Sequence, residues 1–158
     1  MRKSLLIIVG AIVMFMSYSC QKETNPLLME WDTPFGIPPF EEVQPEHYMP
    51  AFLKAMEEHK AEIDAIVNCK EEATFENTIL PYDNAGALYS KVAVVFSSES
   101  GVNSSDAIMA ISKELSPIQS AHFSEISLND ALFQRIKAVY DKRESLNLDE
   151  DQFKLVEE

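Results

Sequence analysis

The stretch from Pro39 to Leu80 decides how this chain folds. It begins with PFEEVQPEHYMPAF (residues 39–52), continues as an amphipathic run to Cys69, and ends with TFENTIL (residues 74–80). We predict a helix from Pro45 to about residue 68, because a proline in the first helical turn lacks only an N–H that would be unpaired anyway. Its inner face recurs every three or four residues, at Phe52, Ala55, Met56, His59, Ile63, Ile66 and Val67.

A second helix is expected to start at Thr74. Its hydroxyl is suited to cap the free N–H groups of a helix start, and Asn77 stands where a capping box places its second side chain. Pro81 cannot donate a backbone hydrogen bond, so we expect the helix to kink or restart at Asp83. A helical stripe then continues to about Ser100, through Ala85, Leu88, Tyr89, Val92, Val95 and Phe96.

Two further helices follow a turn at residues 101–105. Ser104 or Ser105 is expected to cap the third helix, which Pro117 should kink, and Asn129 to cap the fourth. Their apolar stripes are Ile108, Ile111, Leu115 and Ile118 in the third helix and Leu132, Phe133, Ile136, Val139 and Tyr140 in the fourth.

The predicted fold is all-α, an antiparallel helical bundle preceded by an extended, proline-rich arm. Only four glycines occur in 158 residues, and the apolar spacing is helical throughout. A final run with Phe153 and Val156 reaches Glu158 without a helix-stop residue. We therefore expect the chain to be truncated within a longer helical protein.

The composition is strongly acidic, with a formal net charge of −13. Binding to nucleic acid needs clustered lysine and arginine against the phosphates, so the charge argues against a nucleic-acid partner. Two cysteines, Cys20 and Cys69, do not make a disulfide framework.

The amino terminus is typical of a bacterial lipoprotein leader. Arg2 and Lys3 precede about a dozen apolar residues, a run too short to cross a bilayer as a helix, and small polar residues lead to Cys20. Ser17 stands where the usual pattern has Leu, Val or Ile, so an ordinary secretory signal or an uncleaved anchor is the alternative. We expect lipid attachment at Cys20 and a membrane-anchored protein on the periplasmic or cell-surface side of a bacterial envelope.

The predicted layout has a leader, a tether, an arm and a helical domain. The arm contains large apolar side chains between prolines, which exclude a regular helix. We expect it to pack across the helical body; an exposed ligand-binding loop is the alternative. The segments are 1–19 (leader), 20–26 (tether), 27–44 (arm) and 45–158 (helical domain).

The chain offers few candidates for chemistry. No pair of histidines has the spacing of a metalloprotease zinc helix. We expect His59 and His122 to be hydrogen-bonded packing residues and Cys69 to be an unreactive thiol at a helix end. We therefore predict no catalytic and no metal-binding residue in this chain.

Several segments in register carry a resemblance to a known family. They are residues 39–52, EHKAEI (58–63), TFENT (74–78), LSP (115–117) with SAH (120–122), and LNDALFQRIKAVY (128–140). These segments resemble the amino-terminal region of the peptidyl-dipeptidase Dcp, oligopeptidase A and thimet oligopeptidase family of zinc metallopeptidases. The resemblance covers nearly all of the chain from Asn25 onward.

The resemblance implies the wall of a larger enzyme that cleaves short peptides inside a helical channel. In that family the zinc motif lies in the carboxy-terminal half, where zinc activates a water for attack on the peptide carbonyl. This sequence stops before that part, so no catalytic or zinc residue carries over. We expect the parent protein to be a zinc peptidase and this chain alone to be inactive. The alternative is a non-enzymatic helical lipoprotein that binds peptides or a protein partner.

Overall fold

The computed structural model describes residues 24–102 and 104–157, and every regular element in these ranges is helical. This confirms the predicted all-α class. The elements are the 3-10 turns η2 (Pro26–Leu28), η3 (Pro34–Gly36) and η5 (Arg143–Ser145), the π-helical turn η4 (Phe75–Ile79), and the α-helices α2 (Pro45–Asn68), α3 (Leu80–Asn84), α4 (Ala87–Val102), α5 (Asp106–Ser127), α6 (Asp130–Tyr140) and α7 (Glu150–Glu157).

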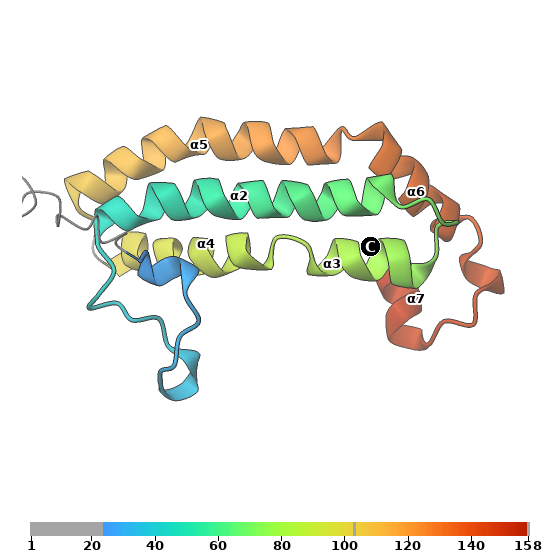
Figure 1. Cartoon of the computed structure of the whole chain (residues 1–158), viewed down its shortest axis with the longest axis horizontal. Coiled ribbons are helices and arrows are strands. Elements are labelled where there is room, and N and C mark those ends of the chain that lie inside the picture. Colours follow the sequence, from blue (N-terminus) through green and yellow to red (C-terminus); the bar gives the residue numbers. More distant parts are fainter. Residues whose placement is uncertain (1–23, 103, 158) are drawn as a thin grey trace, which may run out of the picture.

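Helix α2 is the central element of the molecule. It lies between α5 on one side and the end-to-end pair α3 and α4 on the other (Figure 1). The chain reverses direction between α2 and α3, and again between α4 and α5, so these sequential neighbours run antiparallel. The short helices α6 and α7 cover the end of the bundle where α2 finishes.

The core is divided into three clusters along the bundle. The first joins α2, α4, α5 and η2 around Phe52 and Leu115, which are almost fully buried. The second joins α2 to α5 and α6 through Ile63 and Leu132. The third lies under η4, α6 and α7 around Phe75. Burial of these apolar side chains is the main stabilising contribution to the bundle.

The predicted helix caps are confirmed. The side chain of Thr74 accepts the Asn77 N–H, Ser105 accepts from Ile108, and Asn129 accepts from Leu132. These caps could be predicted because each joins residues three positions apart.

The predicted break after Pro81 is displaced. Pro81 lies inside a helical segment that runs without a gap from η4 into α3, and this segment continues past Asp83 to Asn84. The chain breaks at Ala85 and Gly86, with Gly86 at φ +77°, and α4 starts at Ala87. A restart at Asp83 is therefore wrong. Helix α5 also runs through Pro117 without interruption.

The arm packs against the bundle in its first part. Leu27 is fully buried, and the Trp31 indole donates to the Pro26 carbonyl at 2.9 Å while Lys91 lies over its ring. Ordered contacts begin before the predicted arm boundary, because the Asn25 amide donates to the His47 carbonyl.

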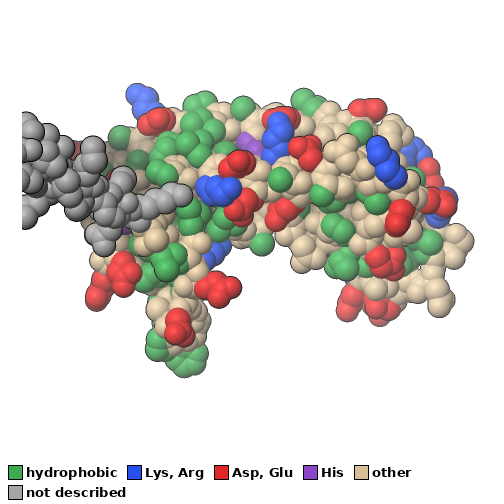
Figure 2. Space-filling model, viewed as in Figure 1, with side chains coloured by type: hydrophobic (Ala, Val, Ile, Leu, Met, Phe, Trp, Pro, Cys, Tyr) green, Lys and Arg blue, Asp and Glu red, His purple; other side chains and the backbone are tan. Residues whose placement is uncertain are grey.

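The tip of the arm does not pack against the bundle, which corrects the expectation for this segment. It projects from the body as a loop (Figure 1), and Figure 2 shows apolar side chains at its end. Phe35 is fully exposed, with φ +63°, and Ile37 is half exposed. The prolines give the loop its shape, but its aromatic tip contacts no core within the described ranges.

The predicted stripe of α6 is only partly buried. Leu132 and Val139 are inside, whereas Phe133 and Tyr140 are 57% and 40% exposed. No helix in residues 24–102 and 104–157 is both long and apolar enough to cross a membrane.

Candidate functional site

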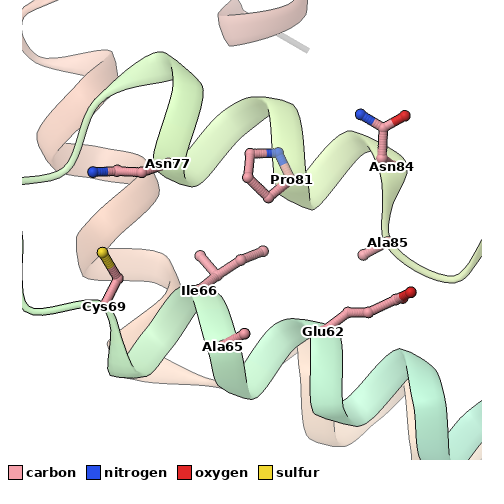
Figure 3. Close-up of a pocket in the computed structure, with 8 residues that line it drawn as sticks. All are labelled: Glu62, Ala65, Ile66, Cys69, Asn77, Pro81, Asn84 and Ala85. Carbon is pink, nitrogen blue, oxygen red and sulfur yellow. The ribbon is translucent and has the colours of Figure 1, made fainter.

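A pocket of about 410 Å³ lies between α2 and the segment formed by η4 and α3. Figure 3 shows residues of α2 along one side and Pro81 of α3 facing them, while the Asn84 side chain is turned away from α2. The floor is apolar, and polar groups stand at its edges. The lining residues are Glu62, Ala65, Ile66, Cys69, Asn77, Pro81, Asn84 and Ala85.

Arg135 of α6 holds the two walls together at one end of the pocket. One guanidinium nitrogen donates to the carbonyls of Cys69 (3.0 Å) and Glu71 (3.2 Å), after the end of α2. The other donates to the side chains of Asn77 (3.0 Å) and Thr78 (3.1 Å) in η4. The planar guanidinium has five donors in a fixed geometry and can reach both walls at once, whereas a lysine ammonium has three donors at one point. This arrangement fixes Asn77 at the pocket edge.

Glu62 fixes the other end. Its carboxylate accepts the Gly86 N–H at 2.7 Å, which ties α2 to the turn between α3 and α4. Among the residues that line the pocket, Glu62 has the charged side chain. The lining is mainly apolar, with the Glu62 carboxylate at its edge, so the pocket can hold a small apolar group that carries a hydrogen-bond donor.

Cys69 lies where the sequence predicted it, at the end of α2. It caps the helix through its backbone, with its N–H donating to Ile66, and its half-buried side chain lines the pocket. The structure places no histidine in that lining, so the thiol has no base beside it there.

The side chains of His59 and His122 are hydrogen-bonded to each other. Nδ1 of His59 on α2 lies 3.1 Å from Nε2 of His122 on α5. Burial is the main cause that lowers the pKa of both imidazoles. The sequence predicted hydrogen-bonded packing residues but not their pairing, because 63 positions separate them.

The described residues contain no group of three or more His, Cys, Asp or Glu side chains that could hold a metal ion. Residues 24–102 and 104–157 therefore do not fit a zinc site. The predicted lipid-attachment residue, Cys20, lies outside the described residues. Sequence reasoning missed Arg135 and Glu62, whose partners are distant in sequence.

Comparison with known proteins identifies relatives. The dipeptidyl carboxypeptidase of Salmonella typhimurium is 37% identical to this chain over 134 residues, and that of Escherichia coli is 35% identical over 133 residues. This chain is similar in sequence to the dipeptidyl carboxypeptidases of both organisms. Oligopeptidase A of Escherichia coli is 25% identical over 134 residues. No protein-family model matches the chain.

The aligned part of each relative is small. The match with the Salmonella typhimurium protein covers 85% of this chain and 20% of that protein. The chain thus spans about a fifth of the length of the curated relatives it matches. The similarity to peptidases stated from the sequence is confirmed, and it concerns their amino-terminal portion.

Proposed function

We infer that this chain is the amino-terminal portion of a zinc-dependent peptidase of the dipeptidyl carboxypeptidase and oligopeptidase type, acting on short peptides. One observation carries the proposal: similarity at 37% identity runs through 85% of this chain and lies within 20% of a dipeptidyl carboxypeptidase. In this proposal the helices form one wall of the substrate channel.

The proposal assigns zinc and its ligands to a part of the longer protein outside this chain. It does so because the described residues do not bring together a set of metal ligands. What these residues contribute is shape: the bundle around α2 and the pocket between α2, η4 and α3. The chain alone is therefore expected not to hydrolyse peptides.

The location of the protein is part of the same proposal. The leader with Arg2, Lys3 and the apolar run before Cys20 supports lipid attachment at Cys20 and a place on the periplasmic or cell-surface side of a bacterial envelope. Two acyl chains would give stable anchoring, which one short apolar segment does not.

The test uses the native protein, captured from the membrane fraction of its host with antibodies raised against this chain. The captured protein should hydrolyse short peptides, lose that activity to a chelator and regain it with zinc. The purified 158-residue chain is the matched control and should be inactive. Captured protein that cleaves no peptide, or a chain that cleaves peptides alone, would contradict the proposal.

A non-enzymatic peptide-binding protein is the second candidate. The open pocket beside Glu62 and the fully exposed Phe35 favour it, because both offer contacts to a ligand. Saturable binding of short peptides by the 158-residue chain, together with an absence of hydrolysis by the native protein, would support this candidate over the peptidase.

A further inference from the structure

The two imidazoles of His59 and His122 form a direct bridge between α2 and α5. Their facing nitrogens are 3.1 Å apart, and the ring planes are inclined by 62°. His59 is only 8% exposed, and His122 is half buried. Few other polar contacts join α2 to α5; the exposed ion pair of Lys60 with Glu125 is one of them.

The number of protons on the pair decides whether the bridge exists. A hydrogen bond between two imidazoles needs one nitrogen that donates and one that accepts. One shared proton satisfies this, whether the pair is neutral or carries a single charge. When both imidazoles are protonated, neither facing nitrogen can accept. Two positive charges then stand close together in a poorly hydrated place, which is unfavourable.

The surroundings leave the rings little room to turn away. A Cβ at Gly86 would lie 3.0 Å from Nδ1 of His59, so the turn after α3 closes directly on that ring. On the other side, the Phe123 ring lies 5.2 Å from the His122 ring, centre to centre, and Tyr89 stacks against His122 at 6.3 Å. Relief of the repulsion therefore requires α5 or the Gly86 turn to move.

We propose that the His59–His122 pair is an acid-sensitive latch, which holds α5 on α2 when one proton is shared and releases it when both imidazoles are protonated.

The His59–His122 pair is also connected to the pocket through contacts between residues. His59 packs against Gly86, the Gly86 N–H is bound by Glu62, and both Glu62 and Ala85 line the pocket. Opening of the latch is expected to loosen that rim.

Charged and titratable groups from all three helices act on the pair. Burial lowers the pKa of His59, and Glu62 on α2 opposes this shift. Burial also lowers the pKa of His122, with His59 and Lys60 adding to the shift and Glu125 on α5 opposing it. From α4, Tyr89 faces His122, and burial raises the pKa of its phenol, which keeps it neutral.

The direction of the pH effect follows from these shifts. Because the pKa of both imidazoles is lowered in the folded chain, the unfolded chain takes up protons at a higher pH than the folded chain. The contribution of the pair to the free energy of unfolding is fully present above the ordinary histidine pKa of about 6.5. This contribution is lost as the pH falls below that value.

The test is amide hydrogen exchange of the full 158-residue chain at about pH 7.5 and about pH 5, corrected for intrinsic exchange, with a chelator present to exclude a metal bridge. Opening of α5 should rise about tenfold or more at the lower pH, a change of about 1.4 kcal/mol in the opening equilibrium. Unchanged protection of α5 would overturn the proposal.

Two variants separate the latch from general acid sensitivity. His122→Gln keeps a donor for His59 but cannot take the second proton, so its α5 protection should not fall at the lower pH. His47→Gln removes an imidazole outside the pair, whose Nδ1 accepts the Gln44 N–H, and should keep the acid response. An acid response that persists in His122→Gln, or vanishes in His47→Gln, would overturn the proposal.

A measurement on the unmodified chain tests the shared proton even if the variants fail to fold. Nuclear magnetic resonance of the imidazole carbons should show that His59 and His122 titrate in two separate steps, as coupled groups do. Independent titration of both rings at the ordinary histidine value would contradict a shared proton.

Discussion

At the scale of single residues, the connections that shape the site come from residues whose partners lie far away in sequence. Gly86 is an example. Its positive φ suits the turn after α3, its N–H binds Glu62, and its missing side chain leaves room for the His59 ring. The positive φ and the close His59 ring each disfavour a larger residue at position 86.

Gly86→Ala should lower the free energy of unfolding by about 2 kcal/mol or more, because it adds a close contact with His59 to the strain of a positive φ. Gly36→Ala is the matched control: Gly36 has φ +65° but nothing within 4 Å of an added Cβ, so only the strain, about 1 kcal/mol, should appear. Urea unfolding measures both. Equal losses would show that His59 does not lie against Gly86.

Arg135→Lys should destabilise the chain by about 2 kcal/mol, since a lysine cannot replace four hydrogen bonds to Cys69, Glu71, Asn77 and Thr78. Arg143→Lys serves as the control: the Arg143 guanidinium donates to the carbonyl of Tyr140, three residues before it, and its contact with a more distant residue is a 3.7 Å ion pair with Glu157, which a lysine can also form. Its urea midpoint should change much less. A similar loss in both variants would argue against Arg135 as the link between α2 and η4.

At the scale of elements, α2 is the central helix of the molecule. It packs against α3 and α4, against α5, and against α6. Its Phe52 is fully buried and meets the rings of Tyr89 and Phe96 at 5.7 and 5.5 Å. The edge-to-face contact with Phe96 and the tilted contact with Tyr89 add to the stabilisation from burial of the ring itself.

Phe52→Ala should cost about 3 kcal/mol or more through lost burial and the cavity that remains. Phe35→Ala removes the same ring from the exposed tip of the arm and should change stability by less than about 0.5 kcal/mol. Circular dichroism during urea titration gives both values. If Phe35→Ala destabilised the chain as Phe52→Ala does, the tip of the arm would be docked on the bundle.

What could be predicted from the sequence was mostly local. The helix from Pro45, the caps at Thr74, Ser105 and Asn129, and the all-α class follow from periodicity and from side chains that bond three residues away. The site could not be predicted in the same way. Its links, from Arg135 to Cys69 and from Glu62 to Gly86, depend on how the helices are packed together.

The two errors in element boundaries have physical causes. Pro81 predicts a kink or restart at Asp83, but the helical segment of η4 and α3 continues through Pro81 to Asn84, and the break falls at Ala85 and Gly86, where Gly86 has a positive φ. The arm was expected to bury its aromatic residues, but the loop is closed by its own bonds, with the Thr33 hydroxyl donating to the Ile37 carbonyl at 2.5 Å. Phe35 is thereby directed outward.

At the scale of the whole molecule, the apolar surface is incompletely covered. The core is divided into three clusters, and large side chains such as Phe133, Leu128 and Val94 are more than half exposed. We therefore expect the isolated chain to unfold over a broad range of temperature, with the α6–α7 end opening before the cluster around Phe52. Scanning calorimetry tests this. A single sharp cooperative transition would contradict it.

The intact mass of the native protein, recovered from the membrane fraction of its host, decides whether this chain is part of a longer peptidase. Because this chain corresponds to about a fifth of its peptidase relatives, we expect a mass several-fold above 17.8 kDa, with acyl chains added. A native mass near that of this chain after removal of the leader would contradict this expectation.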